Sequence, residues 1–417
     1  MKKNFMMMSM LLGCLMASAQ TKTVKVTVSN EWSVDKVDEP VVVRLKEVKK
    51  VGFEVKSARV TCEGREVPCQ LDDMDGDLRV DEVFFLTDVK GLETKSFQVE
   101  LSGEESHADE KPRVYTALQI RDKQDKHPDV LKVEAPGKSF LFNDIYMHGV
   151  TIESELTGYR IYFDHRQNID LYGKKYRRIE LPETQFYTST EQLQQGYGVD
   201  VLWAGNAIGC GSFKDWNMKT LEPENWTDVV VRGQRVVTSG ALRTVVEVYD
   251  LGVKAADGST YDMHQYYSLY AGHRDLTVDV MLEGAGDHRF CTGVQKVGAT
   301  ADEETRRGHQ SEGFWHADGV AASWGCDYPD MGKKQQWAPE PVGLAVYVPK
   351  EYIQGGQEDD LNYLFTVEAD RSNSIRYYVS FCADKEEQGY HSAKEWFASL
   401  DAWKDGVKHP VRVKVGK

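Results

Sequence analysis

The amino-acid sequence predicts an all-β protein with large antiparallel sheets packed face to face, a small β-barrel or sandwich domain before them and one C-terminal helix. Short runs rich in β-branched and aromatic residues alternate with turn residues along almost the whole chain. After residue 113 these runs become longer, as is typical of large antiparallel sheets. The 417 residues are 41% hydrophobic and 28% charged, a globular composition long enough for one large and one smaller domain.

The first nineteen residues have the pattern of a signal peptide. Lys2 and Lys3 precede an apolar stretch over residues 5–16, and the small residues 17–19 form a cleavage pattern. The apolar stretch is too short to remain as a membrane span. The sequence Leu-Leu-Gly-Cys ending at Cys14 also resembles a lipoprotein processing site, at which Cys14 would carry a lipid anchor. We therefore expect a periplasmic or secreted protein without a membrane span, or alternatively an outer-membrane lipoprotein.

The small β domain is expected over residues 20–105. Five short β-type runs separated by turn residues favour a barrel or a sandwich. These runs are residues 22–28, 41–45, 57–62, 82–86 and 97–101. The polar and charged residues 103–112 then indicate a linker.

The large antiparallel domain is expected over residues 113–417. Its clearest strands are residues 158–164, 241–250, 261–270, 276–282, 342–348 and 375–381. Turn residues such as those at 256–259 and 271–274 join neighbouring strands. Only residues 392–403 have apolar side chains at helical spacing, after a capping serine, and this stripe is expected to pack on the core.

Net charge and motifs exclude some classes of function. The net charge of −15 argues against binding to nucleic acid, although a local cluster of basic side chains can still hold an acidic sugar. No GxGxxG, Walker loop or nucleophile elbow is present, so nucleotide and ordinary esterase chemistry lose support. Of the six cysteines after the signal peptide, Cys62 and Cys69 flank a hairpin and are the best local pair for a disulfide, with buried thiols as the alternative.

The most informative segment is residues 148–170. Because side chains alternate along a strand, Arg160, Tyr162, Asp164 and Arg166 are expected to share one face. Guanidinium groups bind a sugar carboxylate in a two-pronged geometry, and Tyr and Asp carry protons or bind hydroxyls. The alternative is a ladder of ion pairs on an exposed sheet. Further candidates in the same segment are His148, Glu153, Gln167 and Asp170.

Two reaction types are open for these residues. In a lyase, Arg160 or Arg166 would neutralise a uronate carboxylate, and His148 or Tyr162 would remove the adjacent proton. In a hydrolase, Asp164 and Glu153 would act as acid and base. A single histidine or an exposed glutamate on a strand also has ordinary structural roles.

Aromatic and basic residues outside this segment are additional candidates for sugar binding. His273 and Arg274 lie at an expected hairpin turn, and Trp315 and His316 lie in a glycine-rich loop. Trp203 is followed by glycines that permit close approach of the backbone to a ligand. Aromatic side chains in such loops stack on sugar rings, but they also anchor loops in many proteins.

An acidic segment in the small domain resembles a calcium loop. Its carboxylates supply hard oxygen ligands around a tight glycine turn, as calcium prefers. The candidate ligands are Asp73, Asp75, Asp77 and Asp81. The position of the glycine does not match an EF-hand, and a solvated hairpin tip is the alternative. No cofactor is expected to be required, and a calcium ion here would be structural.

Three stretches together resemble the Bacteroidota family called domain of unknown function 4861. They are residues 70–82, the segment 148–170 and the strand from Leu242-Arg243 to Tyr249-Asp250. The resemblance extends over nearly all of the mature chain. It implies a galactose-mutarotase-like supersandwich with a concave sheet as the sugar site, and an association with polysaccharide utilisation. It supplies no catalytic set.

These observations favour an enzyme that acts on uronate-containing, pectin-like oligosaccharides by lyase or hydrolase chemistry. The expected partner is therefore an acidic oligosaccharide or polysaccharide. Two alternatives remain, a non-catalytic glycan-binding protein of the cell surface and a sugar epimerase or mutarotase. Fold analogy alone does not decide among them.

Overall fold

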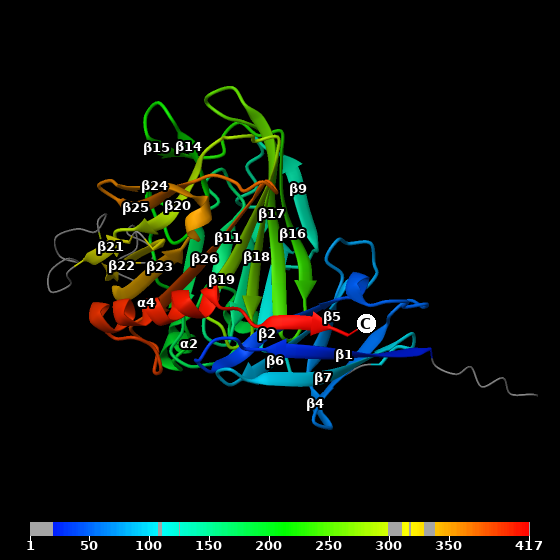
Figure 1. The fold of residues 1–417 in the computed structure, drawn as a ribbon. Helices are drawn as coiled ribbons and strands as arrows, with labels where there is room; N and C mark the ends of the chain where they lie inside the picture. The colour runs from blue at the N-terminus through cyan, green and yellow to red at the C-terminus, as the bar shows by residue number, and fades with distance from the viewer. Residues whose placement is uncertain are drawn as a thin grey trace, which may run out of the picture.

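The computed structural model describes residues 20–106, 111–124, 126–298, 311–316, 318–328 and 338–416. Within these ranges the chain forms antiparallel sheets, and the predicted all-β fold is confirmed (Figure 1). The expected signal peptide and Cys14 lie outside the described residues and stay predictions. None of the helices in the described ranges combines the length and apolarity needed to cross a bilayer.

The first module is a sandwich of a five-stranded and a three-stranded sheet. The first has the order β27-β1-β7-β3-β4 and the second β2-β6-β5. The strands are β1 (Thr21–Ser29), β2 (Lys36–Arg44), β3 (Ser57–Cys62), β4 (Arg65–Val67), β5 (Cys69–Asp72), β6 (Glu82–Val89), β7 (Thr94–Ser102) and β27 (Arg412–Val415), with a 3-10 turn η1 (Leu45–Glu47). Alternate residues of β1, including Val26 and Val28, point into the core between the sheets.

The last strand of the chain belongs to this first module. β27 pairs with β1 in antiparallel register, with Val413 opposite Val28. The sequence placed these residues with the large domain over 113–417, because sequence spacing does not show a pairing between the two ends of a chain. Along the sequence, the large domain is thus inserted between two strands of the same sheet, β1 and β27.

The second module contains three sheets. The nine-stranded sheet has the order β21 (Glu312–Trp315), β22 (Val320–Asp327), β23 (Glu340–Tyr347), β26 (Ser374–Ala383), β19 (Leu276–Glu283), β18 (Thr260–Tyr270), β17 (Arg243–Lys254), β16 (Val231–Ser239) and β9 (Lys132–Pro136). One five-stranded sheet has the order β13 (Val199–Asp200), β12 (Ile169–Gly173), β11 (Gly158–Tyr162), β10 (Ile145–Ser154) and β8 (Val114–Ile120). The other has the order β15 (Glu222–Glu224), β14 (Lys214–Asn217), β20 (Phe290–Gln295), β25 (Asn362–Val367) and β24 (Ile353–Glu358).

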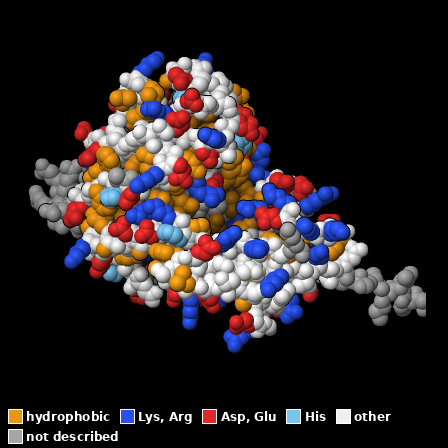
Figure 2. Space-filling model, viewed as in Figure 1, with side chains coloured by type: hydrophobic (Ala, Val, Ile, Leu, Met, Phe, Trp, Pro, Cys, Tyr) orange, Lys and Arg blue, Asp and Glu red, His pale blue; other side chains and the backbone are white. Residues whose placement is uncertain are grey.

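One hydrophobic core joins these three sheets. It contains Ile161 of β11, Val246 of β17 and Phe290 of β20, each fully buried. The nine-stranded sheet therefore packs against both smaller sheets, which is the predicted face-to-face arrangement. On the face of the molecule seen in Figure 2, acidic and basic side chains are interspersed rather than grouped by sign.

The C-terminal helix forms where the sequence predicts it, as α4 (Ala393–Lys408). The Ser392 side chain accepts a hydrogen bond from the Glu395 amide at 3.3 Å, and Trp396 and Leu400 are buried. The expectation of a single helix is wrong in one respect: two further short helices, α1 (Leu181–Thr184) and α2 (Thr190–Gln194), lie between β12 and β13. They are too short to show a helical period in the sequence. A 3-10 turn, η3 (Lys350–Tyr352), precedes β24.

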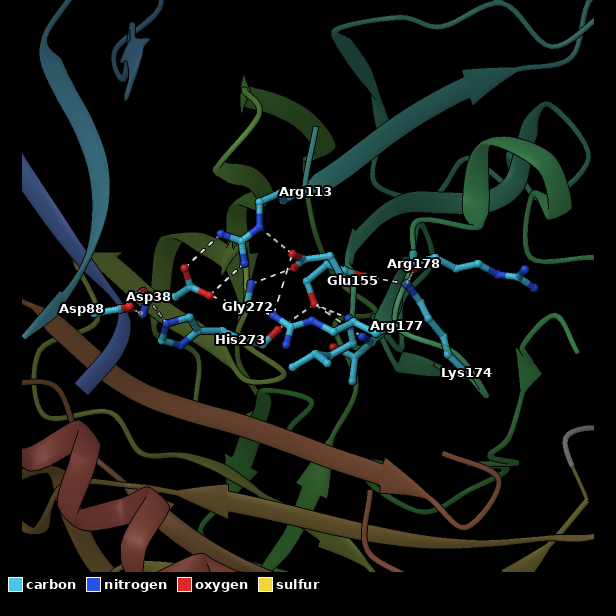
Figure 3. A network of polar contacts seen from close by, with 12 residues as sticks. Asp38, Asp88, Arg113, Glu155, Lys174, Arg177, Arg178, Gly272 and His273 are labelled. Carbon is cyan, nitrogen blue, oxygen red and sulfur yellow. Dashed lines mark hydrogen bonds and ion pairs between the residues drawn. The ribbon is translucent and has the colours of Figure 1, made fainter. Parts of the chain in front are cut away.

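Buried polar contacts join the two modules. Gln70 of β5 accepts from the amides of Leu242 (2.8 Å) and Arg243 (2.9 Å), and Asp72 accepts from the Arg243 guanidinium. Figure 3 shows a second contact, in which Arg113 lies between Asp38 and Glu155. All three stretches that carry the family resemblance thus supply contacts at this boundary.

The six described cysteines form no disulfide. Cys62 ends β3 in the five-stranded sheet of the first module, whereas Cys69 begins β5 in the facing sheet. Both side chains are partly exposed, so the alternative of buried thiols does not describe this pair.

Candidate functional site

A cavity of about 370 Å³ opens beside β11, β12 and β13. Its aromatic lining consists of Phe142, His148, Tyr162, Phe186, Tyr187 and Trp203. Its charged lining consists of Arg160, Asp164, Arg166, Asp170 and Asp200. The volume lies within the range of small-molecule sites, roughly 300–1,000 Å³.

A bulge in β10 places His148 at this cavity. The pairing of β10 with β8 shifts between Tyr146 and Thr151, and Met147 and His148 both have positive φ (58° and 60°). Non-glycine residues rarely adopt this conformation, and such strain gathers at functional sites. Gly149 follows because an added Cβ would lie 1.9 Å from the Ile161 carbonyl oxygen. The bulge thus directs the His148 side chain toward the cavity, as β-bulges near active sites commonly do.

His148 is held in one tautomer. Its Nδ1 lies 2.7 Å from the Phe142 carbonyl oxygen, which accepts, so Nδ1 carries the proton. The ring also stacks on Phe142 with centroids 3.6 Å apart. Burial lowers the pKa of His148, and the positive charges of Arg160 and Arg121 act in the same direction. A neutral imidazole with a free lone pair on Nε2 is the form that accepts a proton near neutral pH.

Arg160 is not free to bind a ligand. It pairs across β11 and β12 with Asp170, at 3.1 Å from Nε, and its Nη2 lies 2.9 Å from the Tyr162 hydroxyl oxygen. The guanidinium carbon lies 4.3 Å from the Phe186 ring centre, and the residue is 4% exposed. Nη1 has no hydrogen-bond partner within the described residues, but it is itself buried. Arg160 therefore organises the cavity wall.

Asp200 is the unusual acid of the site. Its side chain is 17% exposed, and its Oδ2 lies 3.4 Å from Arg160 Nη2. Burial and the adjacent charge of Asp170 raise the pKa of Asp200 well above its ordinary value of 3.8, and Arg160 opposes this only in part. One guanidinium thus faces two carboxyl groups, which favours the protonated form of Asp200. A carboxyl group with a raised pKa and an imidazole with a lowered pKa therefore line one cavity.

Asp164 and Arg166 reach the cavity by a different path from the one predicted. β11 ends at Tyr162, so the four residues do not lie on one strand. Asp164 instead closes a turn, where its Oδ1 accepts from the amides of Arg166 (2.8 Å) and Gln167 (2.9 Å). Arg166 keeps a side chain that is 46% exposed, with Nε 3.3 Å from Asp164. It is the accessible guanidinium of the cavity lining.

The model of the family described as Domain of unknown function (DUF4861) matches residues 28–413. The chain belongs to the DUF4861 family. No curated protein matches it.

Solved structures resemble this DUF4861 chain only loosely. A protein in the glycosyl hydrolase family 38 and an alpha-mannosidase, both from Enterococcus faecalis, share 10% and 9% identity with TM-scores of 0.45 and 0.44. Each match covers 95% of this chain, which spans about half of those chains (47% and 46%). A protein described as an aldose 1-epimerase from Klebsiella pneumoniae shares 9% identity at a TM-score of 0.30, over 71% of this chain and 96% of its own. Likeness at this level indicates no reaction.

Glu153 does not lie at the cavity of the DUF4861 chain, so the proposed pair with Asp164 is wrong. The Glu153 side chain is fully buried and accepts from the amides of Glu180 (2.7 Å) and Leu181 (2.9 Å), at the start of α1. Lys174 forms an ion pair with it. Glu153 shares a sheet face with Arg160, but the segment around α1 covers it.

Three further predicted ligand residues have structural contacts instead. Gln167 is buried and donates to Asp250 at 2.9 Å. His273 lies 2.9 Å from the Asp38 carbonyl oxygen at the module boundary (Figure 3). Arg274 forms a two-pronged pair with Glu386, at 3.2 and 2.9 Å. None of the three lines the 370 Å³ cavity.

Of the candidates in aromatic segments, one lines the cavity and two do not. Trp203 lines the cavity and is 38% exposed. Trp315 and His316 lie at the edge strand β21, where Trp315 packs on Gly356 and His316 Nδ1 accepts a hydrogen bond from the Asp318 amide at 3.0 Å. They do not line this cavity.

The calcium prediction remains a prediction. Carboxylate oxygens of Asp73, Asp75 and Asp81 lie within 4.8 Å of one another, and Asp77 is not part of this group. Asp73 accepts from the amides of Gly76 (2.6 Å) and Leu78 (2.8 Å). These bonds account for the turn by themselves.

Four aromatic or charged residues of the cavity were not predicted from the sequence: Phe142, Phe186, Tyr187 and Asp200. Asp200 has a signal in the sequence, because it is the one polar residue in the apolar run 199–203. Its place beside Asp170 depends on the pairing of β13 with β12, which opposes Asp200 to Tyr172. The other three residues lie in irregular segments, one of which contains Phe186 at positive φ (66°).

Proposed function

We propose that this protein cleaves a glycosidic bond in a sugar chain by acid–base chemistry, with Asp200 as the acid and His148 as the base. The observation that carries the proposal is the carboxyl pair Asp170–Asp200 with one buried arginine, next to a neutral histidine in an aromatic cavity. A carboxyl group with a raised pKa can donate a proton, and an imidazole with a lowered pKa can accept one. The oxygen that leaves the bond takes the proton of Asp200.

Aromatic rings at the mouth of the cavity support a sugar ligand. Phe142, Tyr187 and Trp203 are 39%, 44% and 38% exposed. Half-exposed aromatic rings beside polar groups suit the alternately apolar and hydroxylated faces of a sugar. Arg166 is placed to pair with a carboxylate on that sugar, so we propose a uronate ring in the cavity.

The two possible reactions differ in where His148 takes a proton from, which is the sugar in elimination and water in hydrolysis. In β-elimination, Nε2 takes the proton next to the uronate carboxylate, Arg166 stabilises the negative charge that forms, and a double bond remains after the leaving oxygen departs. In hydrolysis, Nε2 takes a proton from water, which adds to the anomeric carbon. Because the Arg160 guanidinium already binds Asp170 and Tyr162, elimination would depend on Arg166 to stabilise the carboxylate of the substrate.

The test is a screen of the purified mature protein against pectic, rhamnogalacturonan and glucuronate-bearing fragments. Ultraviolet absorbance and new reducing ends are followed in the same reaction. Elimination gives both signals, and hydrolysis gives reducing ends alone. Binding without either signal, detected by calorimetry, would contradict cleavage and leave a glycan-binding protein. Absence of both binding and turnover would contradict a sugar function altogether.

Localisation follows from the expected signal peptide. We propose that the protein works in the periplasm or outside the cell, where polysaccharide fragments are present. Mass spectrometry of the mature N-terminus tests this, because cleavage after residue 19 and lipidation at Cys14 give different masses.

A further inference from the structure

A second cavity adjoins the first. It has a volume of about 580 Å³ and lies between the β14–β15 hairpin, β24 and the segment after β13. Arg166, Asn168 and Gly205 line both cavities. The two cavities therefore share a rim, and a chain molecule bound in one can continue into the other.

A buried lysine holds this shared rim in place. Lys214 of β14 is 4% exposed, and its ammonium group donates to the backbone oxygen of Arg166, to Asn168 Oδ1 (2.9 Å) and to Asn225 Oδ1 (3.0 Å). All three N–H groups of the ammonium are thus used. Burial lowers the pKa of Lys214 to about 7, so the full set of bonds is present at acidic pH. A rim fixed in this way is preorganised for a ligand.

The two cavities differ in their chemistry. The first is aromatic, whereas the described lining of the second contains no aromatic side chain. Amide and hydroxyl groups of Asn206, Thr220 and Gln357 line the second cavity, and such groups donate to and accept from sugar hydroxyls.

Negative charge exceeds positive charge in the second cavity. Glu222, Asp359 and Asp360 line it, against Arg166 and the buried Lys214. Asp359 is used locally, since its carboxylate accepts from the Asn362 side chain at 3.1 Å. Glu222 and Asp360 are exposed. A carboxylate bound here would lie near two like charges, which disfavours it.

We infer that the second cavity binds the neighbouring residue of the same sugar chain and selects an uncharged sugar there. The inference rests on the proposed function, because it takes the first cavity as the site of the uronate ring. It assigns a substrate in which a uronate is linked to a neutral sugar. A chain made of uronates alone is disfavoured.

The test compares three kinds of probe by calorimetry or ligand-observed NMR. They are galacturonic acid, digalacturonate and the disaccharides that join galacturonate to rhamnose in either order. We expect one of the mixed disaccharides to bind about threefold to tenfold more tightly than digalacturonate, since a charge–charge contact at a partly exposed site has about this effect. In the double variant Glu222→Gln/Asp360→Asn, digalacturonate should gain about threefold in affinity, for the same electrostatic reason. Binding of galacturonic acid should not change.

The matched control is Glu358→Gln. Glu358 is an exposed acid at the end of β24, pairs with Lys296 at 2.8 Å and does not line the cavity. It should leave all affinities unchanged. Equal binding of all disaccharides to the wild type, with no effect of the double variant, would overturn the subsite while galacturonic acid still binds. No binding of any probe would overturn the proposed function and the subsite with it.

Discussion

Two buried arginine–carboxylate pairs in this protein have the same chemistry and different surroundings. Arg243 binds Asp72 across the boundary between the modules, and Arg160 binds Asp170 beside the first cavity. At the boundary, Arg243 also binds Glu82 at 2.9 Å, but Arg44 lies 3.4 Å from Glu82 on its other side. The two less exposed carboxylates there, Asp72 and Glu82, thus have two arginines, of which Arg44 also reaches the exposed Glu47 at 3.7 Å.

Beside the cavity, one arginine faces two carboxyl groups. Asp170 forms the shorter ion pair with Arg160. Within the described residues, Asp200 pairs with no other cation than this shared arginine. Burial and the adjacent negative charge of Asp170 raise the pKa of this excess carboxyl group. The Asp72–Arg243 pair, whose charges are matched, is therefore interpreted as structural. Asp200, an acid without its own cation at an open cavity, is interpreted as a candidate reactive group.

The largest expected effect is the loss of turnover in Asp200→Asn. Asparagine keeps the shape and cannot donate the proton, so kcat should fall by about 10²–10⁴. Asp72→Asn should leave kcat per folded molecule unchanged, because Asp72 lies away from the cavity. Turnover and circular dichroism of both variants check this. Equal loss of activity in the two variants would remove the distinction between the pairs.

The second effect is on stability, where the substitution of Asp72 should have a larger effect than that of Asp200. Asp72→Ala leaves Arg243 buried without its main partner, and breaking a buried pair costs about 3–5 kcal/mol of unfolding free energy. Asp200→Asn should cost less than about 1 kcal/mol, because the acid is already neutral. Urea unfolding followed by fluorescence measures both values. A larger loss in Asp200→Asn would mean that Asp200 is ionised and paired.

The fold and part of the cavity could be predicted from the sequence because both depend on local alternation. Strand periodicity located β11 and so brought Arg160 and Tyr162 to one face. Glu153 was misplaced because α1, which shows no period, covers its end of the same face. Asp200 was missed because its neighbours come from a pairing between β13 and β12 across a segment that contains the short helices α1 and α2.

The third effect is on pH dependence. The pKa of His148 lies below its ordinary value of 6.5, so kcat/KM should rise with pH through a region below 6.5 as the imidazole loses its proton. It should fall again at higher pH, as Asp200 loses its proton at a pKa well above 3.8. His148→Gln should remove the acidic limb and keep the alkaline limb. An unchanged acidic limb in that variant would assign it to another group.

The smallest expected effect concerns the aromatic rim. Trp203→Ala should raise KM about threefold to tenfold with little change in kcat, since one aromatic contact contributes about 0.5–1.5 kcal/mol. Trp315→Ala is the matched control, because Trp315 is similarly exposed (40% against 38%) and does not line the cavity. Steady-state kinetics of both variants compare the two surfaces. Equal effects would place sugar binding elsewhere.

The protonation of Asp200 is the central claim, and carbon-13 NMR of labelled aspartate carboxyl groups measures it directly. The Asp200 signal is assigned by its absence in Asp200→Asn and followed through a pH titration. We expect a midpoint well above the ordinary 3.8. A midpoint at or below 3.8 would show that Asp200 is ionised near neutral pH and could not be the acid.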